Sequence, residues 1–210
     1  MSPTYLSYFL DSETPGYGGK TNSVNISLTK SIINGDTSND QTLKFPGHIG
    51  THIDFPFHFS SSAKKCYDYP ASFWIFNKVG LLTCNIEEVK DNLNKLKSDI
   101  EILILKTGFG SNRNKNLYWS NQPIIPANFA TLFKENFPKL RVFGFDMISL
   151  TSKLDRMEGK EAHVNFLINN QILVLEDMNL NELSETPNKV IIAPLQIKEA
   201  SGVPCNVIAF

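Results

Sequence analysis

The pattern of apolar residues along the chain is mainly that of β-strands. Short, continuous apolar runs bounded by polar residues are typical of strands that are buried on both faces. Such runs occupy residues 102–105, 140–145 and 172–175. Residues 23–29 alternate apolar and polar side chains instead, which predicts a strand buried on one face only. Further strands are expected over residues 4–9, 73–83 (one strand or two), 190–197 and 206–210.

Helical patterns are fewer than strand patterns. Residues 126–137 have helical spacing, and the proline at the start of this run suits a first turn. Residues 86–96 follow Asn85, a residue type that caps helices, and begin with acids that the helix dipole favours. Residues 160–167 fit neither pattern. Because no repeat, low-complexity tract or linker interrupts the sequence, we predict a single strand-rich α/β domain over residues 1–210.

Composition narrows the class of partner. The 210 residues carry 20 basic and 21 acidic side chains, a formal net charge of −1, which argues against a nucleic-acid or membrane-surface partner. No apolar run approaches the roughly 18 residues that span a bilayer. The N-terminus also lacks the basic start and apolar run of a signal peptide. Cys66, Cys84 and Cys205 show no CxxC spacing and indicate free, packing cysteines in a reducing, cytoplasmic compartment.

Three of the four histidines fall within residues 48–58. His48, His52, Asp54 and His58 all occupy even positions, so an extended chain would direct them to one face. The odd positions are nearly all apolar and suit packing against a core. The pattern therefore predicts a polar face on an extended segment rather than on a helix.

A straight strand cannot gather these four side chains, because ten extended residues reach about 33 Å. Gly50 and Pro56 are the natural places for the chain to bend and bring them together. Imidazole and carboxylate groups without a thiolate suit Zn²⁺, Mn²⁺ or Fe²⁺. The segment is therefore a candidate metal site with an acid/base histidine beside it.

Three polar residues outside this segment follow or flank apolar strands. Asp146 and Glu176 each end a predicted buried strand, and His163 is the remaining histidine. A buried carboxylate needs a partner, which could be a metal ion or one of the twenty lysines and arginines. From the residues alone, the ion pair is the simpler interpretation for both acids.

Residues 48–58 resemble, position for position, the signature of the metal-dependent cyclase family, which includes bacterial kynurenine formamidases. The resemblance continues in order through weaker segments. These are residues 14–19, 104–108, 144–149, 162–163, 175–178, 194–197 and 202–204. It implies a swivelling β/β/α fold, a homodimer and a pair of divalent metal ions. Zn²⁺ is the first choice for these ions, and Mn²⁺ and Fe²⁺ are the alternatives.

The resemblance also implies a role for every histidine of the chain. The implied metal ligands are His48, His52, Asp54, His163 and Glu176. Asp54 would be shared between the two metals and Glu176 would bridge them. His58 would be the general acid/base, since imidazole has an intrinsic pKa near 6.5.

The implied activity is hydrolysis of a carboxamide by metal-activated water, with His58 protonating the departing nitrogen. The substrate would be a small molecule, an N-formyl aryl amine such as N-formylkynurenine. The family's N-terminal loop usually carries a tryptophan at the substrate, whereas this chain has Tyr17, and Lys20 stands where an acid is common. A tyrosine can still stack on a ring, so an aryl substrate is retained.

Alternatives follow from the same residues. These departures also fit a related cyclic amide, or a cyclase or lactone or cyclic-imide hydrolase of a secondary pathway. A non-catalytic metal-binding protein is a second alternative, although such proteins usually lose a ligand or the acid/base group. A binding module without metal is a third, and it predicts metal-free protein after gentle purification.

Overall fold

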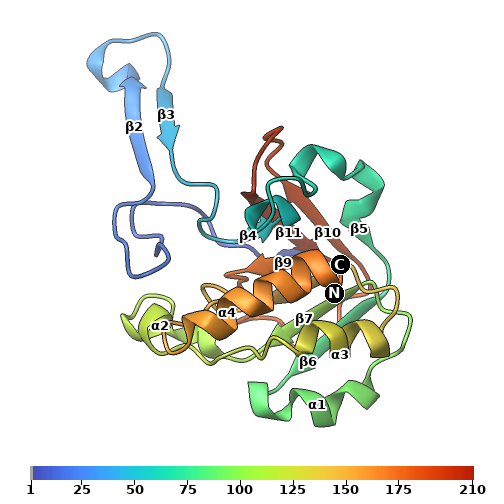
Figure 1. Ribbon diagram of the computed structural model, residues 1–210. Helices are drawn as coiled ribbons and strands as arrows, with labels where there is room; N and C mark the ends of the chain where they lie inside the picture. Colours follow the sequence, from blue (N-terminus) through green and yellow to red (C-terminus); the bar gives the residue numbers. More distant parts are fainter. Residues whose placement is uncertain (1) are drawn as a thin grey trace.

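The computed structural model describes residues 2–210, and its body is a mixed, nine-stranded sheet (Figure 1). In order across the sheet, the strands are β5 (Ile75–Phe76), β10 (Val190–Pro194), β11 (Gly202–Ala209), β4 (His52–Asp54), β9 (Leu173–Glu176), β8 (Val142–Phe145), β7 (Ile102–Lys106) and β6 (Val79–Thr83). The short strand β1 (Thr4–Tyr5) also pairs with β11. The strand-rich α/β fold class predicted from the sequence is confirmed.

The sheet has a parallel and an antiparallel half that meet at β4 and β9. Strands β6, β7, β8 and β9 run parallel, whereas β9, β4, β11, β10 and β5 pair antiparallel. The three apolar runs read as buried strands form β7, β8 and β9, and their apolar side chains are at most 1% exposed. Parallel strands are normally covered on both faces, which is why their sequences are continuously apolar.

Helices pack beside the parallel half of the sheet. They are α1 (Val89–Asn92), α2 (Leu117–Ser120), α3 (Phe129–Asn136) and α4 (Arg156–His163), with wider π turns continuing α4 over Val164–Asn169. The Phe133 ring of α3 lies 5.1 Å from Phe143 of β8, which stacks on Phe166 at 5.2 Å. Residues 160–167, which had no clear pattern, are therefore helical. No helix within residues 2–210 is long and apolar enough to cross a membrane.

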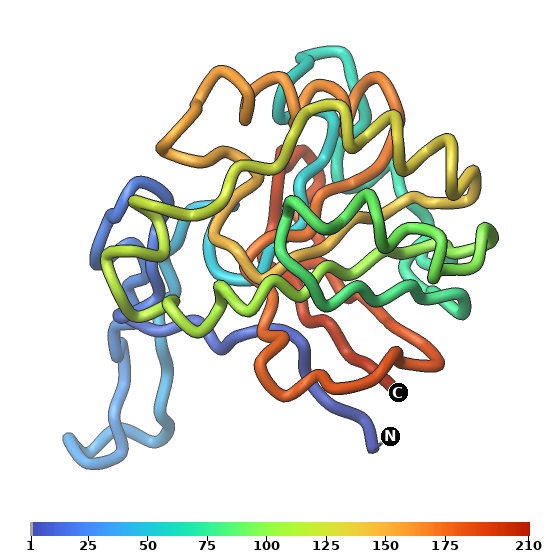
Figure 2. Tube along the Cα trace, turned by 90° about the horizontal axis from the view of Figure 1, so that it is seen from below, coloured from blue at the N-terminus to red at the C-terminus, as the bar shows by residue number. Residues whose placement is uncertain are grey.

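The hairpin of β2 (Asn25–Lys30) and β3 (Asp40–Lys44) projects away from the body in both views (Figures 1 and 2). We call residues 25–44 the arm. Every residue of its two strands is exposed, including Leu28 at 62%. The strand predicted at residues 23–29 is present from Asn25. Of its predicted buried face, Val24 is buried at 2% exposure, but the prediction is wrong for Ile26 and Leu28, because no element within residues 2–210 covers the arm.

Several element boundaries differ from the predictions. The helix expected over residues 86–96 is divided into two 3₁₀ turns around the short α1, since the Asn92 side chain donates a hydrogen bond to the Glu88 carbonyl. Such side-chain bonds compete with regular helix bonds. The helix expected from residue 126 begins at Phe129, the first strand is only two residues long, and β11 begins at Gly202 rather than at residue 206.

Candidate metal centre

The centre of the site lies where β4 and β9 pair in the middle of the sheet. His52 of β4 stands directly opposite Glu176 of β9 in the antiparallel register. Opposed residues on paired strands point to the same face, and Asp54 shares that face because it is two positions from His52. All three residues are buried, with exposed fractions of 4% or less.

The two predicted bend points shape the rest of the histidine segment. Gly50 has φ +58°, a left-handed conformation that favours glycine, and Pro56 begins a 3₁₀ helix that ends at His58. These bends bring the His48 and His58 rings to a centroid distance of 4.1 Å. The bending prediction is therefore confirmed, although only His52–Asp54 form a regular strand.

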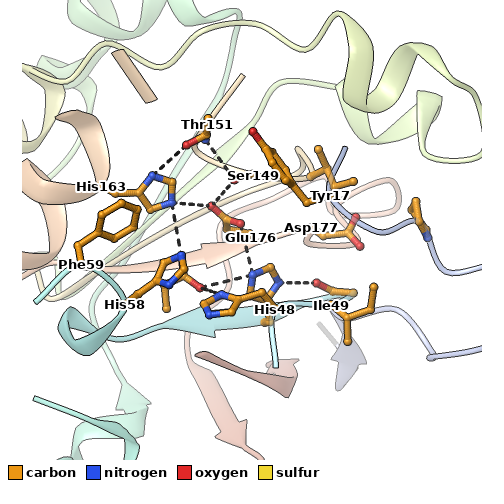
Figure 3. Close-up of a pocket in the computed structure, with 15 residues that line it drawn as sticks. Tyr17, His48, Ile49, His58, Phe59, Ser149, Thr151, His163, Glu176 and Asp177 are labelled. Atoms are coloured by element: carbon orange, nitrogen blue, oxygen red, sulfur yellow. Dashed lines mark hydrogen bonds and ion pairs between the residues drawn. The ribbon is translucent and has the colours of Figure 1, made fainter. Parts of the chain in front are cut away.

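His163 reaches the same place from the C-terminal end of α4. Its Nδ1 donates to the Gly159 carbonyl at 2.8 Å, which leaves Nε2 directed at the two carboxylates. That Nε2 lies 3.6 Å from Asp54 Oδ2 and 3.4 Å from Glu176 Oε1. The Phe59 ring stacks on the other side of the imidazole, at 4.8 Å between centroids (Figure 3).

His52 is held in the matching way. Its Nδ1 donates to the Gly50 carbonyl at 2.8 Å, and its Nε2 lies 3.3 Å from Glu176 Oε2 and 3.4 Å from Asp54 Oδ1. The buried Nε2 atom makes no well-directed hydrogen bond with either carboxylate. A histidine whose Nδ1 is bound to a carbonyl and whose Nε2 faces carboxylate oxygens is oriented as metal-binding histidines are. This orphaned nitrogen fits a divalent metal.

His48 completes the group but is held differently. Its Nδ1 lies 2.8 Å from Asp54 Oδ1 and its Nε2 lies 2.9 Å from the Ser201 hydroxyl. Candidate ligand atoms lie within 4.8 Å of one another in two overlapping sets, one of His48, Asp54 and His58 and the other of His52, Asp54 and Glu176. The predicted site residues are thus brought together, with Asp54 common to both sets.

The electrostatics of the centre favour positive charge. Burial lowers the pKa of His52, but the Glu176 and Asp54 carboxylates outweigh it and raise that pKa to about 9. The same opposition raises the pKa of His163 to about 10. Burial raises the pKa of Asp54, yet hydrogen bonds from His163 and His48 hold it well below its usual value. Since a metal cation would compete with these protons for the same carboxylates, its binding would release protons.

Sequence reasoning missed the groups that hold Glu176. Its Oε1 accepts hydrogen bonds from the Leu150 amide at 2.5 Å and the Ser149 hydroxyl at 3.2 Å. These residues follow β8, and the carboxyl ends of adjacent parallel strands meet at one edge of a sheet, a signal that could have identified them. Ser201 offered no such signal, because 153 residues separate it from His48.

The ion-pair interpretation of the two strand-end acids is wrong. Glu176 faces histidines, as described above. Asp146 accepts hydrogen bonds from the amide and hydroxyl groups of Thr107 and from the amides of Gly108 and Gly110. The Asp146 carboxylate thereby stabilises the turn after β7. Asp146 has a structural role and is not part of the centre.

A buried ion pair lies beside the centre, and its acid, Asp177, lines the same pocket. Arg113 binds the Asp177 carboxylate through Nε at 2.9 Å and a terminal nitrogen at 2.8 Å, and the Tyr118 hydroxyl donates to it at 2.6 Å. The Thr51 hydroxyl donates to the Asp177 carbonyl at 2.5 Å. The Thr51 bond ties the residue before His52 to the residue after Glu176, whereas the Arg113 and Tyr118 bonds anchor Asp177 to the segment that follows β7.

A pocket of about 340 Å³ opens over the centre (Figure 3). The ligand candidates form its floor, and Tyr17, which is 41% exposed, stands in its lining with Pro15, Phe59 and Ile148. Partial burial raises the pKa of the Tyr17 hydroxyl, which is therefore neutral near pH 7. The N-terminal loop thus contributes an aromatic side chain to the lining of the pocket.

Comparisons with known proteins point to one family. The chain is 28% identical over 164 residues to kynurenine formamidase of Bacillus anthracis, covering 77% of this chain and 75% of the relative. A kynurenine formamidase of Bacillus cytotoxicus is 28% identical over 168 residues, with the same coverage of both chains.

Solved structures show the same fold at low sequence identity. Isatin hydrolase A from Labrenzia aggregata, bound to benzyl benzoate, superposes with a TM-score of 0.80 at 17% identity, covering 99% of this chain and 92% of that one. An isatin hydrolase bound to the product analogue thioisatinate gives 0.77 at 15% identity, covering 99% and 91%. The model of the Cyclase family matches residues 4–152, well over half of the sequence. The chain therefore belongs to the Cyclase family, as the signature in residues 48–58 indicated.

Proposed function

We propose that this protein is a metal-dependent hydrolase that cleaves a carboxamide. The observation that carries the proposal is the convergence of buried imidazole nitrogens on the carboxylates of Asp54 and Glu176, at the floor of a pocket. The names of its relatives, kynurenine formamidase and isatin hydrolase, support amide chemistry of this kind.

The proposed cofactor is a pair of divalent metal ions, with Zn²⁺ as the leading choice and Mn²⁺ or Fe²⁺ as alternatives. The proposed ligands are His48, His52, Asp54, His163 and Glu176. Asp54 would be shared, because its two oxygens face histidines on opposite sides. When bound, such a metal lowers the pKa of water toward 7 and polarises a carbonyl group.

His58 is the proposed general acid/base. It is exposed at the pocket, and its ring lies beside those of His48, Phe59 at 4.6 Å and His163 at 6.0 Å between centroids. Burial of part of the ring lowers the pKa of His58, so its neutral form predominates near pH 7. A neutral imidazole can first accept a proton from the attacking water and then deliver that proton to the leaving nitrogen.

The proposed substrate is a small N-formyl aryl amine, with N-formylkynurenine as the leading candidate. Tyr17 would contact the aryl ring, and the apolar wall of Phe59 and Ile148 would face it across the pocket. A second candidate is a cyclic amide opened by the same attack on its carbonyl, as the names of the isatin hydrolases that share this fold suggest.

We also propose that the protein acts in a reducing cytosol as a homodimer. Cys66, Cys84 and Cys205 are all free thiols, which supports a reducing compartment. The exposed arm supports an assembly larger than one chain, because its apolar side chains have no cover within the chain.

The test combines metal content with activity in one sample. Protein purified without chelator should contain about two equivalents of metal by elemental analysis and should hydrolyse N-formylkynurenine or isatin. A metal-bearing protein inactive on both would redirect the search to other amides and lactones. A protein that takes up neither Zn²⁺ nor Mn²⁺ would refute the proposal.

The His58→Ala variant tests the division of roles. Turnover should fall by about 100- to 10,000-fold, the usual contribution of general acid/base catalysis, while the metal content stays unchanged. If the variant loses metal, His58 is a ligand and the assigned role is wrong. The experiment must test this outcome, because a ring nitrogen of His58 lies close enough to His48 and Asp54 to bind the same ion.

A further inference from the structure

One arginine near the pocket has no acid to bind. The chain has three arginines. Arg113 pairs with Asp177, and Arg141 pairs with Glu101. Arg156 forms no ion pair within the described part of the chain. A guanidinium presents its N–H donors in a planar fork that matches a carboxylate. Arg156 is therefore available to an anion from outside the chain.

The position of Arg156 does not serve its own helix. Arg156 is the first residue of α4 and follows the N-cap Asp155, whose carboxylate accepts hydrogen bonds from the amides of Met157 and Glu158. The helix dipole favours acids in the first turn and disfavours cations there. The Arg156 side chain is also exposed, so it is not part of the core. Neither helix stability nor core packing therefore explains an arginine at this position.

Arg156 lies on the side of α4 that faces the pocket. Gly159 and His163 follow it by three and seven positions, so the three residues share one side of the helix. His163 belongs to the floor of the pocket, and Thr151 belongs to its lining. Gly159 packs on Thr151 so closely that a Cβ at Gly159 would lie 2.6 Å from the Thr151 Cα. Since seven residues of helix span about 10 Å, Arg156 begins well away from the floor, along the same wall.

The charge of Arg156 acts on the aromatic residue of the pocket. Burial raises the pKa of the Tyr17 hydroxyl, the Arg156 guanidinium lowers it, and the Glu176 carboxylate raises it. The hydroxyl is thus near both the cation of α4 and an acid of the centre. Tyr17 and Thr151 both line the pocket (Figure 3). A ligand that contacts the Tyr17 ring would therefore lie within the field of Arg156.

Two lysines add positive charge near the same part of the pocket. The Lys153 Nζ lies 4.4 Å from the centroid of the Trp119 ring. That indole packs directly on Gly19, where a Cβ would clash with it. Lys20 follows Gly19 in the loop that carries Tyr17. Neither lysine forms an ion pair among the residues that the structure describes. Cations gathered at one side of a pocket attract anionic ligands to it.

From this arrangement we propose that Arg156 is a specificity-determining residue that binds a carboxylate on the substrate, with Lys153 and Lys20 adding to the attraction. The substrate class is then an aryl amide whose carboxylate ends a short chain on the ring, away from the amide that reacts. N-formylkynurenine belongs to this class, whereas the neutral cyclic amide isatin does not. This inference rests on the hydrolase proposed above and narrows its substrate class.

The test compares two formamides that differ only in charge. The first is N-formylkynurenine without its amino group, so that a carboxylate is its only charge, and the second is the uncharged methyl ester of the first. In the metal-loaded protein, Arg156→Gln should lower kcat/KM for the acid by about 10- to 100-fold, the usual contribution of a hydrogen bond to a charged group. The loss should appear mainly as a higher KM, because the carboxylate is held alike in the ground and transition states. Kinetics with the ester should not change.

Two further variants separate the guanidinium from general charge effects. Lys90→Gln on α1 removes one positive charge from an exposed position outside the pocket, and it should leave the kinetics of both formamides unchanged. Arg156→Lys keeps the charge but loses the planar fork, so it should recover part of the affinity for the acid. An equal loss for acid and ester in Arg156→Gln, or no loss for the acid, overturns the inference.

Binding provides a readout that does not depend on hydrolysis. The deformylated acid and its methyl ester are titrated by calorimetry into the wild-type protein and into Arg156→Gln. The wild-type protein should bind the acid at least about 10-fold more tightly than the ester, and the variant should lose this preference. A wild-type protein without the preference overturns the inference. If the wild-type protein hydrolyses neither formamide, the proposed function fails, and the binding preference still decides the role of Arg156.

Discussion

The metal centre and the arm are built from similar sequence patterns and have opposite environments. Residues 48–58 and residues 23–29 both alternate apolar and polar positions, and each contains a strand, β4 in the first and most of β2 in the second. In β4 the polar residues His52 and Asp54 are buried, whereas in the arm the apolar Leu28 is 62% exposed. Alternation thus specifies a two-faced strand, while the neighbouring elements decide which face water reaches. These inverted environments are what the proposals rest on, a divalent cation at the centre and an assembly larger than one chain at the arm.

The largest effect should come from Asp54, the carboxylate shared by both sets of candidate ligands. Asp54→Asn should lower both metal content and turnover by more than the 10- to 100-fold that loss of an outer partner of a ligand typically costs. Asp40→Asn, in an exposed carboxylate of the arm, should change neither. Elemental analysis and kinetic assays measure both effects in the two variants. Full metal content in the Asp54→Asn variant would contradict the proposed role of Asp54 as a metal ligand.

The second largest effect should come from the buried ion pair of Arg113 and Asp177. Asp177→Asn leaves Arg113 without its charged partner, so the free energy of unfolding should fall by about 3–5 kcal/mol. Asp99→Asn removes an ion pair with Lys78 in which both side chains are about half exposed, and it should cost no more than about 1 kcal/mol. Urea unfolding of the chelator-treated proteins measures both values. Equal costs would show that burial does not make the Arg113–Asp177 pair more important to stability than an exposed ion pair.

The smallest change in stability should come from the arm, and a matched pair of truncations in β4 and β2 compares the two strands directly. Ile53 of β4 is fully buried, so Ile53→Ala should cost about 2–5 kcal/mol. Leu28→Ala on the arm should change the free energy of unfolding by no more than about 0.5 kcal/mol in protein dilute enough to be monomeric. A large loss from Leu28→Ala under those conditions would mean that the arm packs within its own chain.

Much of the fold could be predicted because its strands are locally encoded. The continuous apolar runs that became β7, β8 and β9 are recognisable without any tertiary information. Element ends were less predictable, since they depend on individual hydrogen bonds such as that of the Asn92 side chain. Among the site residues, His48 to His58 lie close in sequence and could be grouped by inspection. His163 and Glu176 were added through the family resemblance, because each is unremarkable alone.

The sequence by itself determined the identity of the donor groups, the bends at Gly50 and Pro56, and the strands that carry them, because these depend on residue chemistry and local backbone preference. Only the tertiary structure decided that His52 faces Glu176, that Ser201 reaches His48 and that Arg113 pairs with Asp177. It also decided that the arm stands free. Such pairings join segments that are far apart in the chain. Strand register and packing determine which segments meet, and the local sequence does not encode either of them.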